Sequence, residues 1–145
     1  MRSLEAAECL WPVQASLGEG PFWSAADEAV WFVDIFGKQI HRFQPGRTVT
    51  QSWSAPAKAS FVLPETGGTL LVGLPGAVAR FWPDTGAFET LTRLERNHPR
   101  NRLNDACIDP HGRLWFGTMD EDAQKKSGAI YRWGEDEPQP EPLDL

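Results

Sequence analysis

The sequence has few cysteines, few basic residues and no long apolar segment, and each scarcity argues against a class of protein. Its two cysteines, Cys9 and Cys107, lack paired spacing, so we predict reduced thiols in a cytoplasmic chain, with Cys107 a small core residue. With 14 Lys and Arg against 20 Asp and Glu, and no basic stripe, a nucleic-acid partner is not expected. No apolar run approaches the roughly 18 residues of a membrane-spanning helix. Nor does a charged-then-apolar leader occur, so we expect neither a membrane span nor a signal peptide.

Several catalytic and phosphate-binding motifs are also absent from the sequence. Its three histidines, His41, His98 and His111, do not have the spacing of metal ligands. No Gly-x-Ser-x-Gly nucleophile motif and no glycine-rich phosphate loop occur. These absences argue against a serine nucleophile of that type, a histidine-bound metal and a nucleotide cofactor.

Aromatic residues and turn residues are what the chain has in quantity. It holds 7 Trp and 8 Phe against 1 Tyr, and its 13 Gly and 12 Pro are spread between short apolar runs. This composition is typical of a sheet protein with many turns. The segment 101–119 shows the pattern most clearly, because apolar runs at 106–108 and 114–116 flank an Asp-Pro-His-Gly turn. It predicts a β-hairpin whose first strand is immediately preceded by a polar cluster.

The hairpin pattern occurs three times along the chain. The segments AVWFVD, TLLVG and RLWFG align, which places Trp31, Leu71 and Trp115 40 and 44 positions apart. The strand after each copy matches as well, as IHRF, VARF and IYRW. A period near 40–45 residues with several short strands per unit is typical of a β-propeller blade. The sequence therefore predicts an all-β fold of the β-propeller type.

The repeat divides the chain into about three blades. We assign residues 17–53 to the first blade, 59–94 to the second and 102–145 to the third. The acidic, proline-rich end of the third blade is either a frayed fourth strand or a disordered tail. Residues 8–14 predict a further strand, at a sheet edge, because Pro12 would disrupt a central strand.

Three polar residues occupy equivalent places near the starts of the predicted inner strands. Glu19 lies 12 positions before Trp31, Ser60 lies 11 before Leu71, and Asn104 lies 11 before Trp115. Arg102 lies close to Asn104. Because inner strands converge on the axis of a propeller, we expect Glu19 and Asn104 to face one central cavity.

Structural alternatives exist for each of these residues. Glu19, between two glycines, is either accessible to an ion or a solvated loop carboxylate. The alternative for Arg102 is a salt bridge to Asp105 or Glu19, and for Asn104 it is a cap on its own turn. The acidic loop at 120–127 points either toward the same rim or toward solvent.

Five segments carry a resemblance to a known family: LGEGPFW, FVDI, NRLND, DPHGRLWFGTM and SGAIYR. In order and spacing they resemble the first half of the senescence-marker-protein/gluconolactonase/regucalcin family, and most of all its sugar lactonases. The resemblance covers essentially the whole chain. It implies a six-bladed propeller with one divalent metal at its axis, in proteins that open aldonolactones to aldonic acids.

The resemblance also implies roles for individual residues. Glu19 corresponds to the family's first metal ligand, and Arg102 and Asn104 correspond to residues that hold the oxygens of the substrate. Asp122 corresponds to an acidic substrate contact, a role that Glu121 also fits. We expect calcium as the ion, with zinc, manganese, magnesium and iron as alternatives at a carboxylate and carboxamide site.

The family's remaining metal ligands, an asparagine and an aspartate that is also its proposed general base, would lie beyond Leu145. No catalytic residue is therefore expected in this chain, which supplies one metal carboxylate and the substrate-binding arm. We expect a metal-dependent hydrolase for a sugar lactone, incomplete in this chain; the alternative is a non-catalytic calcium-binding or scaffold propeller. The expected partners are a small sugar lactone and either a second copy of the chain or the missing half of the propeller. In the family, the strand that matches residues 8–14 closes the last blade.

Overall fold

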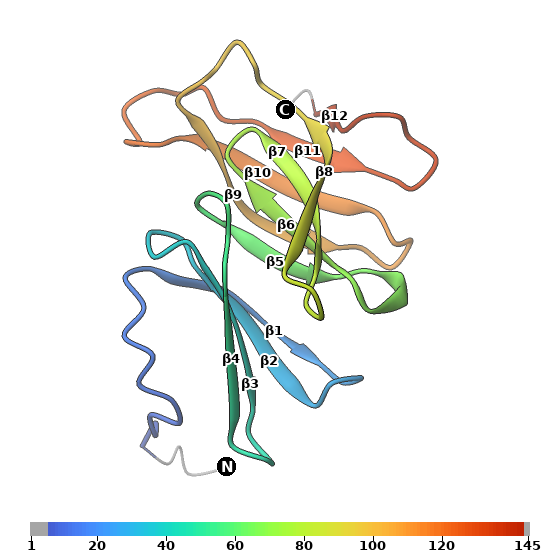
Figure 1. Cartoon of the computed structure of the whole chain (residues 1–145). Helices are drawn as coiled ribbons and strands as arrows, with labels where there is room; N and C mark the ends of the chain where they lie inside the picture. The colour runs from blue at the N-terminus through green and yellow to red at the C-terminus, as the bar shows by residue number, and fades with distance from the viewer. Residues whose placement is uncertain (1–5, 144–145) are drawn as a thin grey trace, which may run out of the picture.

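The computed structural model describes residues 6–143, which form three antiparallel sheets of four strands (Figure 1). Blade 1 consists of β1 (Gly18–Ser24), β2 (Ala29–Asp34), β3 (Gln39–Gln44) and β4 (Val49–Ser54). Blade 2 consists of β5 (Phe61–Pro64), the short 3₁₀ turn η1 (Thr66–Gly68), β6 (Leu70–Leu74), β7 (Ala77–Trp82) and β8 (Ala87–Arg93). Blade 3 consists of β9 (Asn101–Ile108), β10 (Leu114–Asp120), β11 (Ile130–Trp133) and β12 (Glu141–Pro142). None of the described residues belongs to a helix long and apolar enough to cross a membrane.

Each blade is a meander in which strands adjacent in the sequence pair with one another. β5 contacts both β1 and β9, so the first strands of the three blades lie next to one another. This is the arrangement of innermost strands in neighbouring propeller blades. The predicted all-β architecture of about three blades is confirmed.

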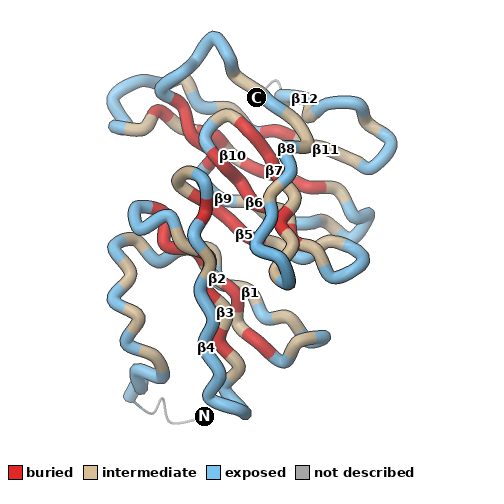
Figure 2. The backbone as a smooth tube through the Cα atoms, viewed as in Figure 1, coloured by how far each residue is buried: buried red, intermediate tan, exposed pale blue. Residues whose placement is uncertain are grey.

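The hydrophobic core lies between the blades, where the apolar faces of the strands meet (Figure 2). Along β2, Ala29, Trp31 and Val33 alternate with less buried residues, as expected for a strand with one face in a core. These residues pack with the apolar face of blade 2. A second cluster joins blades 2 and 3 and consists of Phe61, Val78, Leu103, Leu114, Phe116 and Tyr131.

An acidic residue in the first hairpin of each blade binds side chains of the following strands. Asp27 accepts a hydrogen bond from Trp31 Nε1 at 3.1 Å, and Asp109 accepts one from Trp115 Nε1 at 2.9 Å. In blade 2, Glu65 takes this role and binds Arg80 through two hydrogen bonds. Desolvation acts to raise the pKa of Asp109, but hydrogen bonds from Trp115, Arg113 and His111 outweigh it and hold that pKa well below its usual range.

β9 starts earlier than the sequence pattern predicted. The polar cluster was expected to precede the first strand of the hairpin, yet β9 includes it and begins at Asn101. The reason is that β10 is long enough to pair with it, since Asn101 lies opposite Asp120 and Arg102 opposite Met119. The prediction that Cys107 is a core residue is wrong. Cys107 is exposed because it lies opposite Trp115, on the face of blade 3 that points away from blade 2.

The two ends of the described chain differ in structure. Residues 8–14 form no strand here, and no strand of the described chain lies beside them to pair with, so their ring-closing role stays a prediction. Trp11 instead packs on the outer face of blade 1, against Phe32, His41 and Phe43. The tail, as far as residue 143, contains a short fourth strand, β12, that pairs with β11.

Candidate functional site

Glu19, Arg102 and Asn104 lie near the starts of two innermost strands. Glu19 is the second residue of β1, and the other two belong to the first half of β9. Equivalent strands of neighbouring blades run in the same direction, so the starts of β1, β5 and β9 lie on one side of the molecule. We call this side the site face. The connections 55–60 and 94–100 and the loop 121–129 lie on it as well, because each joins strand ends on that side.

Irregular strand pairing accompanies the candidate residues. The pairing of β1 with β2 shifts register between Glu19 and Phe22, and the pairing of β9 with β10 shifts across Asn104 and Asp105. β5 pairs with β6 without a shift, and its equivalent residue, Ser60, is buried and donates a hydrogen bond to the carbonyl of Gly73. β-bulges re-aim side chains and are common beside functional sites. β1 and β9, which carry the candidate residues, thus have irregular pairing, whereas β5, which carries none, does not.

The carboxylate of Glu19 is free. Its residue is exposed, and no hydrogen bond or ion pair joins its side chain to another residue within 6–143. Gly18 and Gly20 leave little bulk around it, and the φ of +60° at Gly20 is a conformation that favours glycine. This carboxylate is accessible to an ion or a ligand.

The donor set allows only part of a metal site. In the described part of the chain, no three or more His, Cys, Asp or Glu residues gather closely enough to hold an ion. Glu19 fits as one hard oxygen ligand of a divalent ion. The remaining ligands would have to be carbonyl, carboxamide or water oxygens, or side chains from further blades.

Arg102 is almost completely buried, and its guanidinium is held against its own strand. Nη1 donates hydrogen bonds to the carbonyl oxygen of Leu103, at 3.0 Å, and to Asn104 Oδ1, at 3.1 Å. Its Nε is shielded from solvent but has no hydrogen-bond partner among the described residues. Asn104 is exposed and therefore presents its carboxamide both to Arg102 and to the space outside. The pair leaves an unused cationic N–H donor next to an amide group that both donates and accepts.

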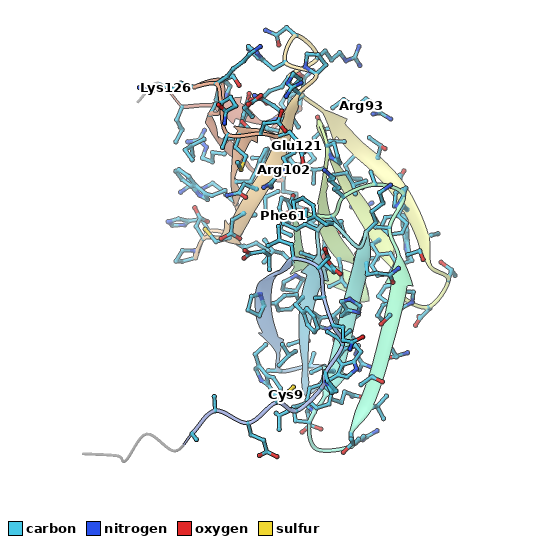
Figure 3. The ribbon with its side chains drawn as sticks, turned by 90° about the vertical axis from the view of Figure 1, so that its left-hand side faces the viewer. Cys9, Phe61, Arg93, Arg102, Glu121 and Lys126 are labelled. Carbon is cyan, nitrogen blue, oxygen red and sulfur yellow. The ribbon has the colours of Figure 1, made fainter. Side chains whose placement is uncertain are left out.

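The alternative salt bridges expected for Arg102 do not form. Within the described residues its ion-pair contact is with Glu121, whose Oε2 lies 3.8 Å from Arg102 Nε, and not with Asp105 or Glu19. In Figure 3, Arg102 and Glu121 lie beside each other above Phe61. Asp122, the residue that matched the family's acidic contact, pairs instead with Arg100. The structure thus places Glu121 rather than Asp122 next to Arg102.

Two acidic residues, the half-buried Glu95 and the buried Asp120, hold these elements in place. Glu95 accepts hydrogen bonds from Asn101 Nδ2 at 2.8 Å, Thr118 Oγ1 at 2.7 Å and Tyr131 Oη at 3.0 Å, and so fixes the start of β9. Asp120 accepts hydrogen bonds from the backbone N–H groups of Gln124, at 3.0 Å, and Lys125, at 3.3 Å, and so shapes the loop that carries Glu121. The hydrogen bond from Gln124 is the main cause that holds the pKa of Asp120 below its usual range.

A groove of about 480 Å³ opens on the site face beside these residues. It is lined by Lys38, Lys58, Arg100, Asn101, Glu121 and Asp122, with Pro56, Ala57, Pro75 and Pro99. Lys58 and Arg100 were not expected from the sequence. Each belongs to a connection between blades, where no strand periodicity indicates which way a side chain points.

Comparison with known proteins identifies the family. The model of the SMP-30/Gluconolactonase/LRE-like region matches residues 17–143, nearly the whole chain. The chain belongs to this family. The resemblance in the five sequence segments is thereby confirmed.

The relatives of the chain have several names. The chain is 32% identical to regucalcin of Xenopus laevis over 130 residues, which cover 86% of the chain and 43% of that protein. It is 36% identical to the L-arabinolactonase of Azospirillum brasilense over 124 residues, 83% of the chain and 41% of that protein. The structure of a calcium-binding protein, regucalcin, from Agrobacterium tumefaciens superposes with a TM-score of 0.81 at 26% identity, and the match covers 88% of the chain and 42% of that structure. The chain thus spans less than half the length of these relatives.

Proposed function

We propose that the chain contributes to a metal-dependent hydrolase that opens a sugar lactone to its aldonic acid. The observation that carries the proposal is the unused, buried Nε–H of Arg102, held beside the exposed carboxamide of Asn104. Together with the free carboxylate of Glu19, it gives the site face donors and acceptors suited to a polyol. The name of the related L-arabinolactonase and the family to which the chain belongs support a lactone as substrate.

Each residue has a distinct role in this proposal. A divalent ion supplies a Lewis acid that stabilises the oxyanion formed when water attacks a lactone carbonyl. Glu19 would hold that ion as one ligand. Arg102 donates to a hydroxyl or ring oxygen of the sugar, Asn104 donates to and accepts from neighbouring hydroxyls, and Glu121 or Asp122 accepts from another. None of the described residues is assigned the role of general base.

The active form in this proposal includes further blades. The other half of the propeller, carried by another chain segment, would supply the remaining metal ligands and the base. A second copy of this chain could add blades but would still lack those residues, so we expect little or no activity from such a pair. We also propose a cytoplasmic location, because both cysteines are exposed free thiols, and calcium as the ion, because the Agrobacterium relative is described as a calcium-binding protein.

A non-catalytic calcium-binding propeller is the second candidate function. The observation that favours it is the free, exposed Glu19 carboxylate, which needs only an ion and no substrate. The buried guanidinium of Arg102 disfavours it, because a cation near a purely structural calcium ion would repel that ion.

Hydrolysis of an aldonolactone, followed by the acid it releases, tests the proposal. It is measured with and without a chelator, for the chain alone and for the assembly that supplies the remaining blades. We expect the assembly to show activity that the chelator abolishes and a divalent ion restores, and the chain alone to show little. Activity that survives chelation would contradict metal dependence. An assembly that binds calcium without hydrolysis would favour the non-catalytic propeller.

A further inference from the structure

Lys58 reaches the candidate site from the connection between blades 1 and 2. Its Nζ lies 2.5 Å from Glu121 Oε1, on the loop of blade 3, and 5.0 Å from the centroid of the Phe36 ring. The side chains of Lys58 and Glu121 are about two-thirds buried, with 33% and 30% of their surface exposed. The ion pair therefore lies across blade 2 on the site face. It joins the connection between blades 1 and 2 to a loop of blade 3.

Glu121 lies between two cations but is bound to only one of them. Its Oε1 accepts a hydrogen bond from Lys58, whereas its Oε2 stays 3.8 Å from Arg102 Nε, beyond hydrogen-bond distance. A buried N–H without a partner is unfavourable, and a charge-assisted bond to a carboxylate would satisfy it. Some force must therefore hold Glu121 back from Arg102, and the contact with Lys58 is the one that the geometry offers.

We infer that Lys58 is a positioning residue that keeps Glu121 from closing on Arg102. It thereby keeps the guanidinium of Arg102 free of a bound carboxylate, so that a ligand oxygen does not have to displace one. The inference rests on the proposed function for the role of Arg102 in ligand binding. The cation–π contact between the Lys58 ammonium and the Phe36 ring also restricts where Nζ lies.

Removal of the Lys58 charge should let Glu121 bind Arg102 directly. A ligand would then have to displace a carboxylate from the guanidinium, so its affinity would fall although neither Arg102 nor Asn104 had changed. In a Glu121→Gln background no carboxylate is present to move, and removal of Lys58 should have little effect.

NMR of the arginine side chains tests, without any ligand, whether Lys58 holds Glu121 away from Arg102. In Lys58→Met we expect the Nε–Hε signal of Arg102 to shift and its exchange with water to slow, as a bond to Glu121 forms. The signal should stay near its position in Glu121→Gln when Lys58→Met is added. Lys126→Met is the matched control, because it removes an exposed positive charge from the blade 3 loop, away from Arg102 and Glu121 (Figure 3). An Nε signal that is the same in Lys58→Met and Lys126→Met would overturn the inference.

Ligand titrations separate this inference from the proposed function. In the assembly that supplies the remaining blades, with calcium present and an aldonic acid as probe, we expect Lys58→Met to weaken binding by about tenfold. In the Glu121→Gln background the loss should be less than about twofold. An equal loss in both backgrounds would contradict the positioning role. If the Nε signal responds as expected but the assembly that supplies the remaining blades binds no aldonic acid, the effect of Lys58 on Glu121 is supported and the proposed function is contradicted.

Discussion

Arg102 carries a permanent charge, yet only 8% of its surface is exposed. Its charge is balanced loosely, by one carboxylate at 3.8 Å, and one of its N–H groups is unused. The sequence raised two salt-bridge alternatives for this residue, to Asp105 and to Glu19, and the structure shows neither. Buried charges are usually paired. An arginine in this state is therefore better explained by a ligand that completes its contacts than by a structural role.

Arg102→Ala should lower kcat/KM for an aldonolactone by about tenfold to a thousandfold in the active assembly, or roughly 1.4–4 kcal/mol. The reason is that the guanidinium would bind the substrate more strongly as charge develops on its oxygens. Metal binding should stay the same or become tighter once the cation is gone. Arg96→Ala, at an exposed arginine of the connection 94–100 on the same face, is the control and should leave turnover unchanged. Loss of metal rather than of turnover would reassign Arg102 to the scaffold.

Tyr131 offers a pH test of the network around Glu95. Burial, with a smaller contribution from its hydrogen bond to Glu95, raises the pKa of Tyr131 to about 12. Because the folded-state pKa lies above the unfolded value of about 10, the stabilisation by Tyr131 is complete below about pH 10 and is lost as the pH rises toward about 12.

The absorbance of the phenolate measures this directly, because the chain has a single tyrosine. We expect the folded chain to titrate near pH 12 and the denatured chain near pH 10. Glu95→Gln should bring the folded value closer to that of the denatured chain. A folded chain that titrates near pH 10 would contradict both the burial of Tyr131 and its hydrogen bond to Glu95.

At the scale of the element, the strands were predictable because their pattern is local. Short apolar runs around turns of Asp, Pro and Gly give the hairpins, and the repeated Trp31 and Trp115 give the blade. The length of β9 was not predictable, because its polar first residues pair only where β10 extends to meet them. For the same reason the bulge at Asn104 could not be foreseen, since it depends on the register between two strands.

The candidate site was predictable only in part. Glu19 and Asn104 followed from their equivalent positions in the blades and from the family motifs, and Arg102 followed from the motifs, although the roles of all three remain proposals. The proximity of Glu121 to Arg102, and the contribution of Lys58, depend on how the connections fold across blade 2. Residues in loops have no periodicity that fixes the direction of a side chain, so neither contact was visible in the sequence.

Gly73 tests the packing of an element against its neighbour. A Cβ at this position in β6 would lie 2.3 Å from Phe61 Cε1, in the core between blades. Gly73→Ala should therefore lower the free energy of unfolding by about 1–3 kcal/mol, measured by denaturant titration. Gly46→Ala is the matched control, since no atom lies within 4 Å of its added Cβ, and it should change stability little. Equal stability of the two variants would contradict the close packing of β6 on β5.

At the scale of the whole molecule, two blades have an outer face without a neighbouring blade. On blade 1, Trp11 covers part of this face, while Trp23 remains 56% exposed. On blade 3, Ile130 is 38% exposed, and Cys107 is exposed too. Blades bury their faces only against neighbours, and large exposed apolar patches mark interaction surfaces. The outer faces of blades 1 and 3 are therefore where further blades would pack.

We expect the isolated chain to associate rather than remain a stable, active monomer. Sedimentation at micromolar concentration should show species larger than the 16.2 kDa chain, or a chain that unfolds without cooperativity. Addition of the remaining blades should convert it to a single closed species. A compact monomer of 16.2 kDa with cooperative unfolding would show that the exposed faces do not need a partner.

The metal-dependent function depends on Glu19 as an ion ligand, and calorimetric titration with calcium tests this most directly. We expect Glu19→Gln to weaken calcium binding at least tenfold, about 1.4 kcal/mol, without loss of the fold. Glu28→Gln should leave it unchanged, because Glu28 is also an exposed glutamate but lies in the turn between β1 and β2, away from the site face. The titration uses the assembly that supplies the remaining blades, and calcium binding that is the same with Glu19→Gln as with the unaltered chain would contradict the proposed site.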